Sequence, residues 1–130
     1  MAEIGFQSTL SLPYETVLEK VTEALKAEGF GILTSIDVKE TMKKKLDVDF
    51  RKYTILGACN PPLAYKALTA RLDVGLLLPC NVIVFEESNM TVVNIIDPMS
   101  MTNFIQDPVL DAVAEEARKR LKRVSEAIQK

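Results

Sequence analysis

The spacing of apolar residues along the chain predicts alternating strands and helices. Residues 3–10 are typical of a strand, and apolar residues in the next segment recur every three or four positions, which predicts a helix that begins near Pro13. Gly29 ends that helix, and residues 30–37, rich in bulky strand-forming side chains, predict a second strand. The apolar positions of the first helix are Tyr14, Val17, Leu18, Val21, Ala24 and Leu25.

A short helix is predicted next, over residues 38–46. Its apolar residues Val38, Met42 and Leu46 lie four apart, so they share one face, and every other position is polar. A third strand is then predicted over residues 50–58.

Two further helices are predicted from a capping residue followed by proline. Asn60 precedes Pro61, and this helix is expected to end near Leu72. Asp107 precedes Pro108 in the same way and begins the longest helix, which extends to residue 129. We also expect Asp37 and Asp97 to cap or close turns at the ends of elements. The long helix carries one apolar stripe, formed by Leu110, Val113, Ala114, Ala117, Leu121, Val124 and Ile128.

Two strands, residues 76–86 and 90–97, are separated by Ser88 and Asn89, which predicts an antiparallel hairpin. Pro79 cannot donate to a ladder, so we expect an edge position or a bend there. The element order is therefore β-α-β-α-β-α-β-β-α. We predict an α+β fold with two layers, in which one mainly antiparallel sheet of four to six strands has its helices on one face. Residues 1–130 are expected to form a single domain.

The charge balance removes several classes of partner. With 16 basic and 18 acidic residues the net charge is −2, so no positive field is available to hold a nucleic acid backbone. No stretch approaches the length of a membrane-spanning helix, and no signal peptide is evident, so we expect a cytoplasmic protein without a membrane partner.

Candidate chemistry gathers at one turn, residues 57–62. The chain has no histidine, which removes the most common acid-base residue and favours a binding protein over an enzyme. Cys59, Asn60 and Pro61 mark a strand end that enters a helix N-terminus, where the helix dipole can lower the pKa of a partly exposed thiol. Cys59 can equally be a small buried apolar residue.

Cys80 and Asn81 lie beside Pro79, and we include both among the candidate ligand-binding residues. The two cysteines could form a redox pair, but two thiols lack the four ligands of a closed zinc site, so no metal is predicted. Met99 and Met101, near Phe104, could line an apolar pocket or fill gaps in the core.

Four segments carry a resemblance that covers nearly the whole chain. They are GFGILTSIDVK at residues 29–39, GACNPPLA at residues 57–64, GLLLPCNV at residues 75–82, and Asp97 with Pro98. In these segments the chain resembles the bacterial and archaeal family called domain of unknown function 302. The resemblance implies a two-layer fold grouped with TATA-box-binding-protein-like sheets, helices on one side of the sheet, and a dimer. It implies no activity.

The strand pattern also suggests a homodimer. Leu76, Leu78, Val82 and Val84 form one alternating set, and Leu77, Ile83 and Phe85 form the other, so both faces of this strand are apolar. Helices on one face leave the other face for a second copy to cover. We therefore expect a dimeric ligand-binding or accessory module with its site near residues 57–62. Its ligand would be a small molecule. The sequence identifies neither this molecule nor a cofactor. The alternative is a thiol-dependent redox or sulfur-handling protein that uses Cys59, alone or together with Cys80.

Overall fold

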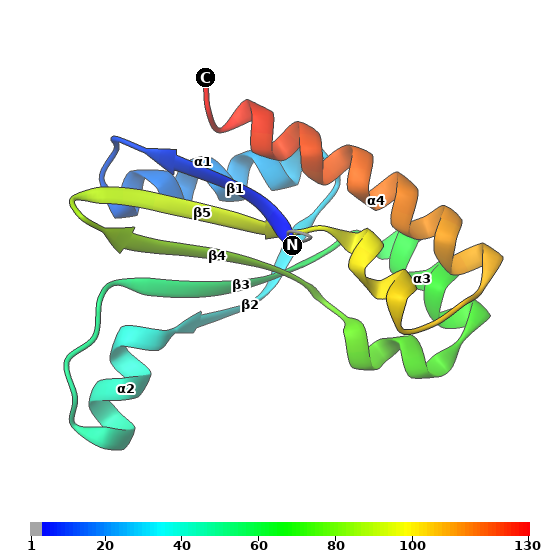
Figure 1. The fold of residues 1–130 in the computed structure, drawn as a ribbon, viewed down its shortest axis with the longest axis horizontal. Coiled ribbons are helices and arrows are strands. Elements are labelled where there is room, and N and C mark those ends of the chain that lie inside the picture. The colour runs from blue at the N-terminus through cyan, green and yellow to red at the C-terminus, as the bar shows by residue number, and fades with distance from the viewer. Residues whose placement is uncertain (1–3) are drawn as a thin grey trace.

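The computed structural model describes residues 4–130 of the chain, and its strands and α-helices follow the predicted order (Figure 1). Two 3-10 helices, η1 and η2, are added to that order. The predicted first strand began at residue 3, which lies outside the described residues. The elements are β1 (Gly5–Leu10), α1 (Tyr14–Ala27), β2 (Gly31–Asp37), α2 (Val38–Leu46), β3 (Tyr53–Cys59), α3 (Pro61–Ala70), η1 (Leu72–Leu77), β4 (Cys80–Glu87), β5 (Met90–Ile96), η2 (Pro98–Asn103) and α4 (Pro108–Ala127).

The five strands form one sheet in the order β1-β5-β4-β3-β2, and every neighbouring pair is antiparallel. The predicted hairpin joins β4 to β5 through Ser88 and Asn89, whose φ angles of 50° and 65° suit the tight turns that connect such strands. The sheet therefore confirms the expected α+β class and its antiparallel pairing.

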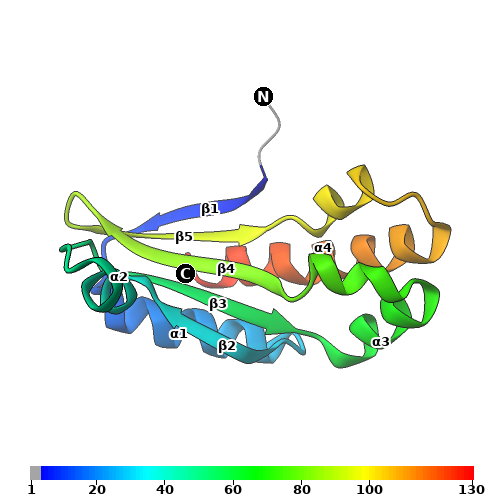
Figure 2. The same cartoon turned by 90° about the horizontal axis from the view of Figure 1, so that it is seen from below.

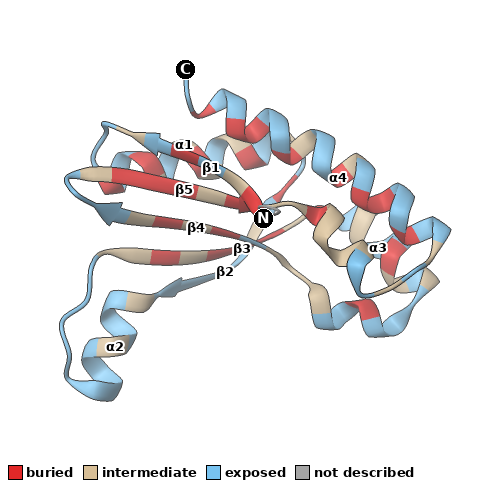
Figure 3. Ribbon diagram, viewed as in Figure 1, coloured by how far each residue is buried: buried red, intermediate tan, exposed pale blue. Residues whose placement is uncertain are grey.

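Helices α1 and α4 cover one face of this sheet (Figure 2). Each turns its apolar stripe inward, so that buried positions alternate with exposed ones along the ribbon (Figure 3). All seven stripe residues predicted for α4 are buried, which removes a large apolar area from water.

The apolar stripe of α4 contributes to two separate hydrophobic clusters. Its second half, from Ala117 onward, packs in the main core against the sheet and α1. Leu110 and Val113 instead belong to a second cluster with Ala67 of α3 and Val74 of η1. The first half of α4 therefore extends past the end of the sheet, and these two side chains contact helices instead of strands.

The predicted strand over residues 76–86 is wrong in its first part. Residues 72–77 form η1, and Leu76 is 88% exposed. The pairing explains the shift. In the ladder between β3 and β4 the last paired residues are Ala58 and Cys80, and β3 ends at Cys59, so no partner strand remains for residues before Cys80. Val74 gains burial by turning into the second cluster.

Two other boundaries differ from the predictions. The third strand begins at Tyr53 and not at residue 50, because β4 pairs with residues from Tyr53 onward. Helix α3 ends at Ala70 and not near Leu72, because the next residue, Arg71, has an extended backbone conformation. The capping predictions are confirmed, since Asp37, Asp97 and Asp107 each accept a backbone N–H at the start of a helix.

The sheet face opposite α1 and α4 carries a band of apolar side chains. Ile36, Ile55 and Ile83 are in register across β2, β3 and β4, and they alternate with residues that face the helices. None of the three is fully buried. Helix α2 extends from the end of β2 and away from this sheet, and it has no buried residue (Figure 1).

The packing of α4 on the sheet can be tested at Leu121, which is fully buried. Replacing it by alanine removes apolar contacts and leaves a cavity, so Leu121→Ala is expected to lower the free energy of unfolding by about 2–5 kcal/mol. Urea denaturation at one fixed protein concentration measures this loss. Lys122→Ala, at an exposed neighbouring position, serves as the control and should leave the midpoint almost unchanged. An unaltered midpoint for Leu121→Ala would refute the packing.

Candidate functional site

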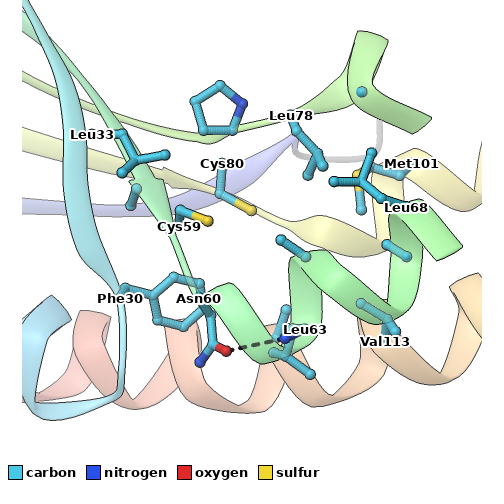
Figure 4. A pocket seen from close by; sticks show the side chains of 16 residues that line it. Phe30, Leu33, Cys59, Asn60, Leu63, Leu68, Leu78, Cys80, Met101 and Val113 are labelled. Carbon is cyan, nitrogen blue, oxygen red and sulfur yellow. Dashed lines mark hydrogen bonds between the residues drawn. The ribbon is translucent and has the colours of Figure 1, made fainter. Parts of the chain in front are cut away.

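A cavity of about 320 Å³ lies where the sheet ends and α3 begins (Figure 4). Its walls come from the ends of β2, β3 and β4, from α3, η1 and η2, and from the middle of α4. None of the lining residues carries a charge, and nearly all of the exposed wall is apolar. The lining residues are Phe30, Leu33, Ala58, Cys59, Asn60, Leu63, Ala64, Ala67, Leu68, Gly75, Leu78, Pro79, Cys80, Met101, Val113 and Ala117.

The turn that separates β3 from α3 is fixed by local sequence. The Asn60 side chain accepts the backbone N–H of Leu63 at 3.3 Å and so caps α3, while Pro61 and Pro62 occupy the first turn, where no intrahelical N–H is needed. Caps of this kind contribute about 1 kcal/mol. Asn60 is buried, and its oxygen is used in this cap. The structure therefore gives Asn60 a structural role at the cavity wall.

Gly57 is required on β3 because side chains from β2 and from the residue before β4 approach it closely. A Cβ added to Gly57 would overlap the Thr34 side chain and lie 2.8 Å from Cγ of Pro79. With glycine at this position, Pro79 can pack against β3, and both Pro79 and Cys80 line the cavity.

Short side chains leave the space open. Five of the sixteen lining residues are alanine or glycine, and they lie on β3, α3, η1 and α4. Alanine side chains are too short to fill the space between α3, α4 and the end of the sheet, so close packing is not reached there. The volume is about twice the ~150 Å³ of an engineered apolar cavity that stays dry and binds benzene. The cavity can therefore hold an organic molecule without rearrangement.

Both cysteines face this cavity. Cys80 pairs in register with Ala58, the residue before Cys59, and the two sulfur atoms point into the same space (Figure 4). Burial, together with the charge that Cys59 would carry, raises the pKa of Cys80 to about 11. Cys80 is therefore a neutral thiol near pH 7.

The structure brings together three of the five predicted site residues. Cys59, Asn60 and Cys80 line the cavity, whereas Pro61 is exposed at the start of α3 and does not line it. Asn81 is also exposed, and it lines a neighbouring depression of about 240 Å³ between η1 and η2. The cavity wall and this depression share Leu78, Pro79, Cys80 and Met101.

Sequence reasoning missed the walls that α3 and α4 supply. In the sequence these residues look like ordinary core positions, and the only hint of a cavity is that several of them are alanines. They are Leu63, Ala64, Ala67 and Ala117. Of the methionines noted beforehand, Met101 lines the cavity and Met99 does not.

The described residues also limit the chemistry available here. Residues 4–130 contain no group of three or more histidine, cysteine, aspartate or glutamate side chains placed to hold a metal ion. No helix within the same range is long and apolar enough to cross a membrane.

The fold and the site define an α+β protein with an uncharged apolar cavity at one end of an antiparallel sheet. The family model for the domain of unknown function DUF302 matches residues 6–128, so the chain belongs to that family. It is similar to a crystal structure of an uncharacterized conserved DUF302 protein from Bacillus stearothermophilus, with a TM-score of 0.88 and 31% sequence identity over 97% of this chain and 98% of that one. No curated protein matches the chain.

The raised pKa of Cys80 predicts a distinctive alkylation profile. Because only the thiolate attacks iodoacetamide, the rate at Cys80 should rise about tenfold per pH unit and continue to rise beyond pH 9. A Cys59→Ala variant leaves Cys80 as the single thiol, and mass spectrometry gives its rate. The same variant unfolded in urea is the control and should level off near pH 9, as an ordinary thiol does. A folded-state plateau below pH 9 would contradict the buried position of Cys80.

Proposed function

We propose that this protein is a dimer that binds an uncharged, apolar small molecule in the cavity beside the Gly57–Pro62 turn. The observation that carries this proposal is a preformed cavity of about 320 Å³ with no charged lining residue. Ligand sites in proteins are typically concave, mainly apolar and largely preformed.

The lining supports one chemical class of ligand. A charged group placed in this cavity would lose its hydration and meet no counter-charge, which is strongly unfavourable. The polar groups at the wall are the two thiols and the amide of Asn60, whose oxygen already accepts the N–H of Leu63. Since a cavity of about half this volume holds benzene, a ligand of one or two rings, or a hydrocarbon chain of similar volume, fits.

The uncovered sheet face supports the dimer. Leu76, Leu77 and Leu78 precede β4, so they do not belong to the predicted apolar strand. Apolar side chains on both faces remain for Val82, Ile83, Val84 and Phe85. Val82 and Val84 are buried toward the helices, while Ile83 and Phe85 are half-buried on the opposite face. Exposed apolar area of this kind is stabilised by a partner surface.

Helix α2 supports a second copy as that partner. Its predicted stripe of Val38, Met42 and Leu46 contributes no buried residue, and Leu46 is 66% exposed. The helix follows β2 directly, and β2 carries Ile36 of the apolar band. A dimer built on identical, self-complementary patches would cover the sheet and α2 of both copies at once.

The dimer and the cavity would be linked through Leu33. This residue is 67% exposed at the bulge in β2, and it also lines the cavity. A partner seated on the uncovered sheet face would therefore also cover the rim of the cavity, which would shield a bound apolar molecule from water.

The thiol-dependent alternative has one supporting observation, namely that both cysteines line one cavity. The chemistry of Cys80 argues against it. A thiol with a pKa of about 11 supplies little thiolate at neutral pH, and the thiolate is the attacking species in thiol-disulfide exchange. Binding without turnover is the function that the geometry supports best.

Cavity binding can be tested with 1-naphthylamine, a two-ring fluorophore that is uncharged near pH 7. The wild-type protein should enhance its fluorescence with a stoichiometry of one per chain. Ala64→Phe places a ring inside the cavity and should reduce the affinity at least tenfold. Lys66→Phe puts the same ring on the exposed face of α3 and serves as the matched control. Equal binding by both variants would contradict the site.

The dimer can be tested by sedimentation equilibrium at micromolar concentration. The wild-type protein should have twice the 14.5 kDa mass of one copy. Ile83→Lys should shift the equilibrium toward monomer, because burying the lysine charge in the interface without a counter-charge is unfavourable. Tyr65→Lys, at an exposed apolar position on α3, is the control and should remain dimeric. A wild-type mass of 14.5 kDa would refute the dimer.

A further inference from the structure

The cavity adjoins a second hollow, the depression of about 240 Å³ between η1 and η2. The two spaces share Leu78, Pro79, Cys80 and Met101 in their linings, so they meet at these four residues. Leu78 and Met101 lie at the end of the cavity that is away from Phe30 (Figure 4). A molecule that fills the cavity from Phe30 to this end therefore reaches the side chains that border the depression.

Met101 is the most adaptable side chain of the shared wall. Pro79 is a rigid ring, and Cys80 is held in the ladder of β4, so neither moves far. Met101 is half-buried on η2, and its unbranched side chain has three rotatable bonds. The start of η2 is fixed, because Asp97 accepts a backbone N–H there and pairs with Arg118 of α4 at 3.1 Å. A rotamer change at Met101 can therefore open a passage while η2 stays in place.

The depression offers the polar groups that the cavity lacks. Asn81 and Ser100 line it, and none of its lining residues is charged. Asn81 is exposed, and its amide has two N–H donors and one carbonyl acceptor. The Ser100 hydroxyl donates to the backbone carbonyl of Asp97 at 2.8 Å, so its oxygen can still accept a hydrogen bond. A neutral polar group is matched here, whereas a charged group would meet no counter-charge.

Apolar side chains border the same depression. Leu76 of η1 and Phe104, directly after η2, line it and are 88% and 77% exposed. Exposed apolar side chains that gather at a hollow are typical of a binding surface. An alkyl chain that leaves the cavity beside Met101 would therefore stay in apolar surroundings until it reaches the polar groups.

We propose that the ligand is a neutral, single-chain amphiphile that spans both spaces. Its alkyl chain occupies the cavity and passes Met101, and its uncharged end group, such as a hydroxyl or an amide, hydrogen-bonds to Asn81 and Ser100 in the depression. This inference rests on the proposed binding of an uncharged molecule in the cavity, and it names the chemical class of that molecule. A compact two-ring molecule occupies the cavity alone, so the two spaces can be tested separately.

The class of ligand can be tested by displacing bound 1-naphthylamine with 1-decanol or with decanoate at pH 8. Decanol should displace the fluorophore with a stoichiometry of one per chain. Decanoate has a chain of the same length but carries a charge, so it should bind at least tenfold more weakly. From 1-hexanol to 1-decanol the affinity should rise about fourfold with each CH₂ group, as burial of methylene groups predicts. Equal displacement by decanol and decanoate would overturn the proposal.

The depression can be tested with two variants. Asn81→Ala removes the amide and Ser100→Phe fills the hollow, and each should weaken decanol binding at least fivefold without changing the affinity for 1-naphthylamine. Asn103→Phe puts the same ring at an exposed position of η2 that lines neither space, and this matched control should bind both molecules as the wild type does.

Retained binding of 1-naphthylamine also shows that a variant is folded. Unchanged decanol affinity in Asn81→Ala, with 1-naphthylamine still bound, would overturn the amphiphile proposal and leave the cavity site intact. A wild-type protein that does not bind 1-naphthylamine would instead refute the proposed function, and this inference with it.

Discussion

The apolar stripe of α4 is the feature on which the rest of the structure depends. Its second half, from Ala117 to Ile128, is buried against the sheet and α1, while Leu110 and Val113 hold α3 and η1 through a second cluster. One helix thus spans two cores that do not merge. Because Val113 and Ala117 lie at the junction, the space between the cores opens beside them, and this space is the cavity. Substitutions in the stripe would therefore affect stability and cavity shape together.

The cavity is lined by uncharged residues. The chain has no histidine, and the lining contains no carboxylate, lysine or arginine that could transfer a proton or stabilise a charge. The cavity instead offers a defined shape, an apolar surface and sulfur-containing side chains. These properties suit the uncharged ligand that we propose, and in the proposed dimer a second copy would cover the rim of the cavity.

Much of the fold could be predicted from the sequence, because the relevant signals are local. The stripe of α4, the caps at Asn60 and Asp107 and the turn between β4 and β5 all follow from side-chain periodicity or turn chemistry. The start of β4 could not be predicted, since it depends on where β3 ends and therefore on pairing between distant residues. Only part of the cavity could be predicted, because its lining also depends on contacts between distant residues. Its two cysteines stand out in the sequence, whereas its alanines on α3 and α4 look like ordinary core residues until the helices are placed.

A crystal of the protein equilibrated with pressurised xenon tests the central claim most directly, because xenon enters preformed, dry, apolar cavities. The account predicts xenon between Ala64, Ala67 and Cys80, with the surrounding side chains unmoved. A cavity that is collapsed, or filled with ordered water hydrogen-bonded to its wall, would contradict the claim that this end of the sheet holds a ready site for an apolar molecule.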